Sequence, residues 1–346
     1  MRALVYHGPG ERSWDDVPDP VLKDPDDAVV RVDGCTICGT DLHILRGDVP
    51  EVQVGRVLGH EAVGTVTEIG PGVRTVAPGD RVLMSCINAC GRCRFCREQR
   101  YGQCLAGGGW VLGHLIDGVQ AEAVRIPFAD TSVHPLPAEV GAEAALMLAD
   151  ILPTSYEVGV LNGEVGPGDV VVVVGAGPIG LSAVLTVRLF GPARVVVVDP
   201  VASRREAALA LGADQALAPD DDMLGAVHAA TEGLGADVAI EAVGAPATFD
   251  AAVALVRPGG RVANVGVHGR PTTLHLEDLW AKDLTIRTGL VDTSSTPTLL
   301  RMVRSGQLDA ARLVTHRFGF DEVPAAYDVF EDPASSGALK VAVLRS

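Results

Sequence analysis

The chain has 346 residues, 47% of them hydrophobic and 21% charged, which is the composition of a globular protein rather than a disordered one. This length exceeds what one compact core usually spans, so we expect two domains. The charge balance is 28 Lys and Arg against 44 Asp and Glu. A net charge of −16 without a basic run argues against nucleic acid and anionic membranes as partners, because nothing would neutralise their phosphates.

The N-terminal stretch "MRALVYHGPGERSWDD" lacks the apolar core of a signal peptide, so we expect a cytoplasmic protein. An uncharged stretch over residues 170–187 has the length of a transmembrane candidate. It is interrupted by glycines and Pro178, however, and we interpret it as a buried parallel strand, a tight turn and a helix. The sequence therefore predicts no membrane partner.

Short β-prone runs fill the first part of the chain, up to about residue 150. They lie at residues 28–32, 62–70, 80–85 and 121–126, and turns rich in Gly and Pro separate them. This pattern predicts an irregular, mainly antiparallel β-domain.

Four closely spaced cysteines occur in "CINACGRCRFCREQRYGQC", at Cys90, Cys93, Cys96 and Cys104. Four thiolates on one compact loop can close a tetrahedral shell around zinc and leave no position for water, so the motif predicts a structural zinc site. An iron–sulfur cluster with similar ligands is one alternative, and free core cysteines are another. Seven cysteines without an export signal do not indicate a disulfide framework.

Further potential metal ligands are scattered along the first part of the chain. Cys38 lies in "TICGTDLHI", His60 and Glu61 lie in "VLGHEAVG", and Asp150 lies in "EAALMLADILPTSYE". Asp150 follows an apolar run, where a buried carboxylate is costly unless a positive group compensates it. Cysteine, histidine and carboxylate are all zinc ligands, and three protein ligands leave a fourth position open. Spacing alone does not join them, because a small buried cysteine and an ordinary His–Glu pair explain these residues equally well.

Strands and helices alternate in the second part of the chain. Apolar strands are expected at residues 170–174, 194–198, 236–242, 261–266 and 284–289, with helical patterns between them. This alternation predicts an α/β fold with a doubly wound parallel sheet. The tail contains a helical segment, "TPTLLRMVRSGQL", and a final strand, "LKVAVLR".

A glycine-rich sequence follows the first of these strands. "VVVVVGAGPIGLSA" places Gly175, Gly177 and Gly180 in a G-x-G-x-x-G pattern, which lets the backbone approach a pyrophosphate at a helix N-terminus. Asp199 ends the second strand, 24 residues after Gly175, where an acid can hydrogen-bond the adenosine ribose and repel a 2′-phosphate. These residues predict NAD rather than NADP. The alternative is a structural turn with an acid that caps the strand end.

Together these motifs resemble the zinc-containing medium-chain alcohol dehydrogenase family along essentially the whole chain. The matching pieces are "CGTDLHILRGDVP", "GHEAVGTVTEIG", the four-cysteine motif, "GAGPIG" and Asp199. Within the family, "GGGWVLGHLIDG", "DILPTSYE" and "LVDTSSTPTLL" are most similar to the bacterial secondary-alcohol and short-chain alcohol dehydrogenases. The resemblance implies a mainly β, GroES-like catalytic zinc-binding domain (residues 1–152 and 293–346, with a structural-zinc lobe at 86–106). A Rossmann NAD-binding domain at residues 153–292 would be inserted into it.

The resemblance also implies two zinc ions per chain. The catalytic zinc would be held by Cys38, His60 and Asp150, with Glu61 as an occasional ligand or a neighbour of the ligands, and the structural zinc by Cys90, Cys93, Cys96 and Cys104. Thr40 and His43 would pass the alcohol proton to solvent through the nicotinamide ribose, although turn hydrogen bonds explain them too. Thr40 and Trp110 would line the substrate pocket.

A further set of residues would contact NAD by the same resemblance. It comprises Gly175, Gly177, Pro178, Ile179, Gly180, Asp199, Arg204, Thr154, Val265, Val267, Leu290 and Val291. Thr154 is expected at the nicotinamide end of the cofactor. The last four are expected to line the nicotinamide pocket, at the carboxyl ends of strands.

The function implied is an NAD-dependent zinc alcohol dehydrogenase that interconverts small primary or secondary alcohols with aldehydes or ketones. Within the family, a polyol or amino-alcohol dehydrogenase of the threonine or butanediol type is the alternative. A catalytically inactive NAD-binding zinc protein is the alternative of another class. The resemblance implies a homotetramer, with a dimer as the alternative assembly.

Overall fold

The computed structural model describes residues 1–345, and the chain divides into two compact units. The first comprises Met1–Pro153 and Val291–Ser346, and the second comprises Thr154–Leu290. The boundaries differ slightly from those expected, because Pro153, Val291 and Asp292 belong to the first unit. The middle of the chain is thus inserted into a unit that the tail completes.

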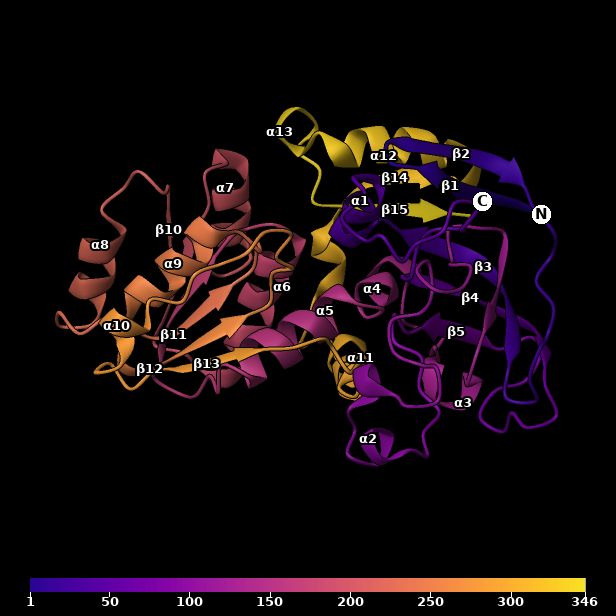
Figure 1. Cartoon of the computed structure of the whole chain (residues 1–346), viewed down its shortest axis with the longest axis horizontal. Coiled ribbons are helices and arrows are strands. Elements are labelled where there is room, and N and C mark those ends of the chain that lie inside the picture. Colours follow the sequence, from indigo (N-terminus) through magenta and orange to yellow (C-terminus); the bar gives the residue numbers. More distant parts are fainter. Residues whose placement is uncertain (346) are drawn as a thin grey trace. The chain divides into compact units, whose positions relative to one another are not determined.

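A mixed sheet forms the centre of the first unit (Figure 1). Its main path runs β14-β15-β3-β4-β5-β7, with β6 also paired to β3. The strands are β3 (Ala28–Thr36), β4 (Ala62–Ile69), β5 (Arg81–Met84), β6 (Ala123–Ile126), β7 (Val133–Pro135), β14 (Val314–Gly319) and β15 (Lys340–Leu344). All pairs are antiparallel except β14 with β15. The tail strand β15 lies directly against β3, so residues from both ends of the chain share one sheet.

An N-terminal hairpin, which the sequence patterns did not predict, adds a second small sheet. Its strands are β1 (Arg2–Gly8) and β2 (Glu11–Asp16), joined at a Pro-Gly turn. The helices of this unit are α1 (Gly39–Leu45), α2 (Arg94–Arg97), α3 (Ala129–Ser132), α4 (Ala142–Met147), α11 (Thr296–Arg304), α12 (Val323–Glu331) and α13 (Pro333–Ser336), and α5 (Ile151–Thr154) spans the unit boundary. Single 3-10 turns occur at Tyr101–Gln103, Ala310–Leu313 and Phe320–Glu322.

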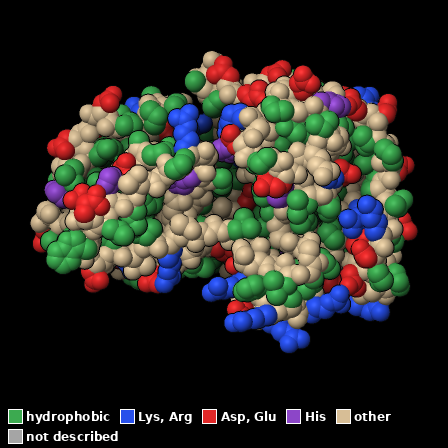
Figure 2. Space-filling view, viewed as in Figure 1, with side chains coloured by type: hydrophobic (Ala, Val, Ile, Leu, Met, Phe, Trp, Pro, Cys, Tyr) green, Lys and Arg blue, Asp and Glu red, His purple; other side chains and the backbone are tan. Residues whose placement is uncertain are grey.

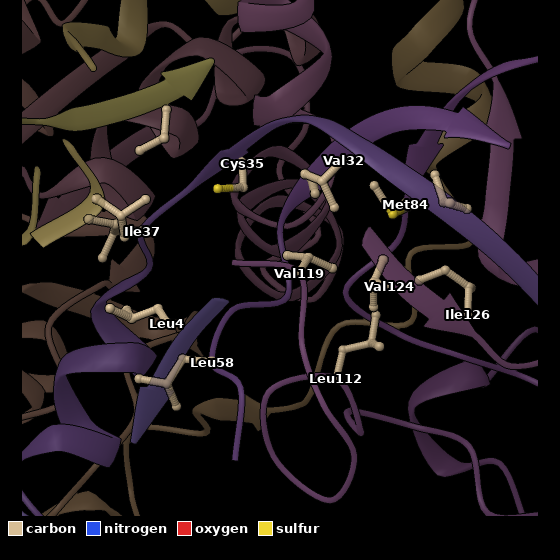
Figure 3. Close-up of a cluster of buried hydrophobic side chains, with 14 of the residues drawn as sticks. Leu4, Val32, Cys35, Ile37, Leu58, Met84, Leu112, Val119, Val124 and Ile126 are labelled. Atoms are coloured by element: carbon tan, nitrogen blue, oxygen red, sulfur yellow. The ribbon is translucent and has the colours of Figure 1, made fainter. Parts of the chain in front are cut away.

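The hydrophobic core of the first unit lies between this sheet and the segments that cover it (Figure 3). Leu4 of the hairpin, Val32 of β3 and Met84 of β5 are all fully buried in it. Val119, which precedes β6, and Val124 within β6 belong to the same cluster. The core therefore joins segments that are far apart in the sequence.

A six-stranded parallel sheet forms the second unit, in the order β10-β9-β8-β11-β12-β13 (Figure 1). The strands are β8 (Val170–Val174), β9 (Arg194–Val198), β10 (Gln215–Leu217), β11 (Ala236–Glu241), β12 (Val256–Asn264) and β13 (Thr285–Thr288). Numbered from β8, this is the 3-2-1-4-5-6 order of a doubly wound nucleotide-binding fold. The expected parallel sheet is confirmed, and the structure adds the short strand β10 and an earlier start of β12.

Helices cover both faces of this sheet, and every residue of β8 is therefore buried. They are α6 (Pro178–Val187), α7 (Ala202–Ala210), α8 (Met223–Ala230), α9 (Pro246–Leu255) and α10 (Leu276–Leu279), with a π-helical segment at Ser155–Leu161 and a 3-10 turn at Arg188–Phe190. The π-helical segment packs on α6, while α8 and α9 pack on each other. No helix within residues 1–345 is long and apolar enough to span a membrane, since the valine-rich stretch divides into β8, a turn and α6.

Candidate metal centres and cofactor site

The first potential ligand, Cys38, lies directly before helix α1. Its backbone N–H donates to Asp41 Oδ2 at 3.0 Å, so the acid in the first helical turn fixes the start of the helix. The side chain of Cys38 is 8% exposed. Helix α1 thus presents the thiol at its N-terminal end, close to the end of β3.

Cys38, His60 and Asp150 converge in the first unit, and we call them the three-ligand centre. Cys38 Sγ lies 3.6 Å from Asp150 Oδ2, and His60 Nε2 lies 3.3 Å from the same oxygen. One donor atom from each residue lies within 4.8 Å of the others. His60 follows Gly59, whose φ of +91° is a conformation that residues other than glycine rarely adopt.

The geometry of this centre fits zinc. A tetrahedral zinc with bonds of about 2.0–2.3 Å holds a sulfur and an oxygen ligand about 3.6 Å apart, and a nitrogen and an oxygen ligand about 3.4 Å apart. The observed separations of 3.6 Å and 3.3 Å match both values. Three protein ligands of these types would hold the metal and leave one position open.

The buried charges of the centre also favour a bound cation. Burial raises the pKa of the Cys38 thiol, and the nearby Glu61 and Asp150 carboxylates raise it further. Burial alone would lower the pKa of His60, but Asp150 and Cys38 raise it well above the ordinary value. Several acids gathered in a dry site lack sufficient positive charge, and a divalent metal would supply it.

A chain of buried polar groups lies behind His60, and hydrogen bonds join all of its links except the one to His60 itself. Its Nδ1 atom lies 3.6 Å from Asp41 Oδ1, while Gln120 Nε2 donates to Asp41 Oδ2 at 3.0 Å. Tyr327 in α12 donates its hydroxyl to Gln120 Oε1 at 2.8 Å. An acid behind a histidine ligand fixes which ring nitrogen faces the metal. Sequence patterns missed this role of Asp41, although it lies three residues after Cys38 in the quoted motif.

Glu61 is held by Lys340, a lysine that is only 1% exposed. The ammonium group of Lys340 donates to Glu61 Oε2 and, at 2.9 Å, to the carbonyl oxygen of Ile37. Glu61 Oε1 has no hydrogen-bond partner in the described chain. Lys340 thus contacts the neighbours in sequence of two ligands, Cys38 and His60. Sequence analysis missed it, because β15 lies almost 300 residues away.

The expected relay and pocket residues lie around this centre. Thr40 Oγ1 is 3.6 Å from Cys38 Sγ, and His43 Nδ1 is bound to Asp48 Oδ2 at 2.8 Å. Thr40 and His43 share a face of α1, since three residues separate them. The indole ring of Trp110 meets the His60 ring edge-on, with centroids 6.1 Å apart. An apolar aromatic surface therefore flanks the ligands.

The four-cysteine lobe, residues 86–106, brings Cys90, Cys93, Cys96 and Cys104 together. Cys96 Sγ lies 3.8 Å from Cys90 Sγ and 3.4 Å from Cys93 Sγ. A tetrahedral zinc with four sulfur ligands holds them about 3.8 Å apart, so the lobe also fits the metal. The Cys90 N–H donates to Cys104 Sγ at 3.3 Å, and the Leu105 N–H donates to Cys93 Sγ at 3.5 Å.

The environment of this lobe stabilises the Cys93 thiolate, whereas burial raises the pKa of Cys96 to about 12. Backbone N–H groups, first that of Leu105, lower the pKa of Cys93 to about 6. Lys and Arg side chains gather over the α2 region of the surface (Figure 2). The exposed arginines of the lobe are Arg92, Arg94, Arg97 and Arg100. This cationic surface lies in a chain with a net charge of −16.

The glycine-rich loop of the second unit has the geometry that a pyrophosphate site needs. Gly175 follows β8 with a φ of +100°, and a Cβ on Gly180 would lie only 1.8 Å from the Gly175 carbonyl oxygen. Around Gly177 nothing lies within 4 Å of a Cβ position, so the backbone is open to a ligand at the start of α6, which begins at Pro178 and Ile179.

Asp199 is tied to this loop. Its Oδ2 accepts from the Ala176 N–H at 2.7 Å and its Oδ1 from the Val201 N–H at 2.8 Å. Arg205 donates to the Asp199 carbonyl oxygen at 2.7 Å, and the predicted contact of Arg204 with the cofactor stays a prediction. Two carboxylate oxygens have lone pairs left for ribose hydroxyls, so the structural bonds do not exclude a cofactor contact.

The remaining cofactor candidates lie at or near strand ends. Val265 follows β12 and is 9% exposed, while Val267 is 61% exposed. Leu290 is 46% exposed and ends the second unit, and Val291, 4% exposed, begins the returning part of the first. Thr154 is the first residue of the second unit.

Comparison with known proteins identifies the class. A zinc-binding dehydrogenase domain model matches residues 178–305, and an alcohol dehydrogenase GroES-like domain model matches residues 24–138. An alcohol dehydrogenase of Cupriavidus necator is 35% identical, over 99% of this chain and 98% of its own. The chain belongs to the zinc-containing medium-chain alcohol dehydrogenase family, with its GroES-like and Rossmann-type domains.

Solved structures agree closely with this fold. Zinc-dependent alcohol dehydrogenase 2 from Streptococcus pneumonia is 44% identical, with a TM-score of 0.96 over 100% of this chain and 99% of its own. The alcohol dehydrogenase TADH from Thermus sp. ATN1 is 37% identical, with a TM-score of 0.92 over the whole of both chains.

Two more distant structures contain nicotinamide cofactors. A putative zinc-binding dehydrogenase from Sinorhizobium meliloti, 29% identical with a TM-score of 0.87 and covering 99% and 98% of the chains, was solved with NADP. A short chain alcohol dehydrogenase from E. coli, 27% identical with a TM-score of 0.88 and covering 99% of each chain, was solved with NADH. This chain is accordingly a zinc-dependent alcohol oxidoreductase that uses a nicotinamide cofactor.

Proposed function

We propose that this protein is an NAD-dependent alcohol dehydrogenase that interconverts small primary or secondary alcohols with aldehydes or ketones. The convergence of Cys38, His60 and Asp150 supports this most directly, because three buried ligands at zinc distances would leave one position for an alcohol oxygen. When bound, zinc would lower the pKa of the alcohol and the nicotinamide would accept hydride.

The residues around the centre would then move the alcohol proton. Thr40, beside the Cys38 sulfur, would accept the proton at its hydroxyl and release its own. His43, 25% exposed and bound to Asp48, would transfer the proton to solvent from its ring. Asp41 would hold His60 in the ring orientation that presents Nε2 to the metal.

Trp110 would favour small, largely apolar alcohols over polyols. Its ring flanks His60 and stacks on His114, with ring centroids 4.2 Å apart, so apolar surface would face the substrate. A polyol bound against that surface would lose the hydrogen bonds that its hydroxyl groups make to water.

We further propose two zinc ions per chain and a preference for NAD over NADP. The two clusters of ligand atoms support the first, and the Asp199 carboxylate beside the glycine loop supports the second. A 2′-phosphate near that carboxylate would suffer charge repulsion.

We also propose self-association into a homotetramer, with a dimer as the alternative. Strand β13 ends the parallel sheet, and Trp280 and Leu276 nearby are 82% and 63% exposed. A sheet edge beside apolar side chains is a surface that another copy can cover. Sedimentation of a Trp280→Glu variant against the wild type checks this assembly.

A single substrate panel tests the proposed function. Purified protein is assayed with NAD and NADP against propanol, 2-propanol, threonine, sorbitol and 2,3-butanediol. We expect turnover of the simple alcohols with NAD at the highest kcat/KM. A higher kcat/KM for threonine, sorbitol or butanediol would refute the proposed substrate class, and no turnover of any alcohol by zinc-loaded protein would refute the activity.

A further inference from the structure

A buried acid closes the carboxyl end of β11 in the second unit. Glu241 is the last residue of that strand and is 0% exposed. Its Oε1 atom accepts three hydrogen bonds, from the Val243 N–H at 2.9 Å, the Gly244 N–H at 2.9 Å and the Thr248 hydroxyl at 2.7 Å. One carboxylate oxygen therefore holds the whole turn from β11 into α9.

The other oxygen of this carboxylate is not hydrogen-bonded. Glu241 Oε2 is buried without a partner, and the His268 Nε2 atom lies 3.7 Å away. Leaving half of a buried carboxylate unpaired is costly, and the imidazole of His268 is a polar group that lies beside this oxygen.

His268 is itself anchored at both ring nitrogens. Asn264 Nδ2 donates to the Gly266 carbonyl oxygen at 3.0 Å, which leaves Asn264 Oδ1 as the acceptor of His268 Nε2 at 2.9 Å. The Thr272 hydroxyl lies 2.9 Å from His268 Nδ1 and donates to it. The ring also meets Phe249 edge-on, with centroids 6.1 Å apart. These contacts fix the imidazole against Glu241.

The backbone segments that follow β11 and β12 are tightly packed against each other. The Glu241 carbonyl oxygen accepts from the Val265 and Gly266 N–H groups, at 2.8 and 3.1 Å. A Cβ on Gly266 would lie 2.1 Å from the Gly244 nitrogen, and a Cβ on Gly244 would lie 2.2 Å from the Val267 carbonyl oxygen. The turn after β11 and the loop 265–268 after β12 are therefore in direct contact.

These two segments lie beside the glycine-rich loop at the same edge of the sheet (Figure 1). Glu241 is in register with Val174, the residue before Gly175, and with Asn264. The Val243 side chain occupies the place where a Cβ on Gly175 would lie. In doubly wound sheets the cofactor binds along this edge, outside the carboxyl ends of the strands.

We propose that Glu241 and His268 are positioning residues that hold the loop 265–268 in the shape that receives the nicotinamide half of the cofactor. This inference rests on the proposed NAD-binding function and assigns a role to residues outside the pyrophosphate loop. His268 hydrogen-bonds Asn264 and lies beside the Glu241 carboxylate. Asn264 and the Glu241 carbonyl group in turn hold the backbone of Val265 and Gly266. The adenosine half depends instead on the loop at Gly175–Gly180 and on Asp199.

The test measures the Kd of two ligands, NADH and AMP, for the cofactor-free protein. NADH spans both halves of the site, whereas AMP occupies the adenosine half alone. A His268→Phe variant keeps an aromatic ring against Phe249 and removes both ring nitrogens. We expect its Kd for NADH to rise about tenfold, as the loss of one or two hydrogen bonds predicts, and its Kd for AMP to change less than about twofold. Backbone amides of residues 265–267 should exchange hydrogen faster even without ligand.

Two further variants separate this role from a general loss of structure. His268→Gln retains a donor for Asn264 and should recover part of the NADH affinity. His275→Phe is the matched control, because His275 pairs with Glu277 at 2.9 Å in the same unit but is 56% exposed. It should bind NADH and AMP like the wild type.

The outcomes distinguish failure of the positioning role from failure of the proposed cofactor binding. Unchanged NADH affinity and amide exchange in His268→Phe would overturn the positioning role. Equal weakening of NADH and AMP would also overturn it, since the pair would then support the whole fold. A wild-type protein that binds neither AMP nor NADH would refute the proposed cofactor itself.

Discussion

The four-cysteine lobe and the three-ligand centre place potential metal ligands in contrasting surroundings. The lobe's ligands lie between Cys90 and Cys104, three of them partly exposed, and backbone N–H groups donate to their sulfurs. The ligands of the other centre, Cys38, His60 and Asp150, are all at most 9% exposed and come from distant parts of the first unit. A local loop suffices for a closed site, whereas an open, dry site requires the tertiary fold.

The Asp150→Asn substitution should have the largest effect. It removes one anionic ligand from the three-ligand centre and leaves the lobe untouched, so zinc should fall from two ions per chain to one. Loss of residues behind a ligand already costs 10–100-fold, and loss of a ligand should lower kcat/KM at least about 100-fold. Metal analysis and steady-state kinetics check both effects. Retention of two zinc ions and of activity would show that Asp150 is only a structural acid.

The Lys340→Met substitution breaks the buried ion pair behind the same centre. It leaves Glu61 charged and uncompensated, so the free energy of unfolding should fall by about 3–5 kcal/mol. Zinc should also leave the three-ligand centre faster in a chelator, while the lobe keeps its metal. Denaturant melts and timed chelation measure the two effects. Lys23→Met, at an exposed lysine, is the control and should change neither quantity.

The Cys93→Ser substitution in the lobe should lower stability and leave activity nearly unchanged. We expect loss of one zinc and a Tm lower by about 5–10 °C, because the metal organises this loop. The remaining folded protein should keep kcat within about twofold, since a closed site offers no position to substrate. Calorimetry and kinetics at 25 °C check this. Arg94→Ser, beside the ligands, should keep both zinc ions, and a collapse of kcat in Cys93→Ser at unchanged Tm would reverse the assigned roles.

Acidification should have the smallest effect, and it acts away from both centres. Burial lowers the pKa of His134 in β7 to about 4, below its ordinary value of 6.5. The unfolded chain therefore binds a proton that the native chain does not. This contribution to stability is complete above about pH 6.5 and is lost as the pH falls toward 4.

The expected loss is about 1 kcal/mol, or about 2–4 °C in Tm, because the ring is partly exposed. His134→Gln should have a flatter Tm profile between pH 7 and 5 than the wild type. Parallel metal analysis separates this loss from zinc release. An equally steep profile in the variant would assign the acid sensitivity to other groups.

Sequence patterns predicted the features that depend on neighbouring residues. The four-cysteine spacing, the glycine-rich turn after Val170–Val174 and most strands of both units follow from local chemistry. The hairpin β1–β2 was not predicted, because Pro9-Gly10 joins two strands with mixed polarity. The short edge strand β10 gave too few residues for a pattern.

Contacts between residues that are far apart in the sequence could not be predicted from local patterns. Lys340, Asp41, Glu241 and His268 are polar residues whose roles appear only through their partners. Arg205 donates to the Asp199 carbonyl oxygen, a contact that no sequence pattern predicted.

The sequence by itself determined the four-cysteine lobe, the glycine-rich loop and the alternation of strands and helices, because each depends on spacing within about 20 residues. The tertiary structure decided which residues, far apart in the sequence, lie together around one site. Asp150 lies with Cys38 and His60 only because the folded first unit brings them together. Its burial after an apolar run then has a physical reason, since a metal ion there would compensate a carboxylate that water no longer reaches.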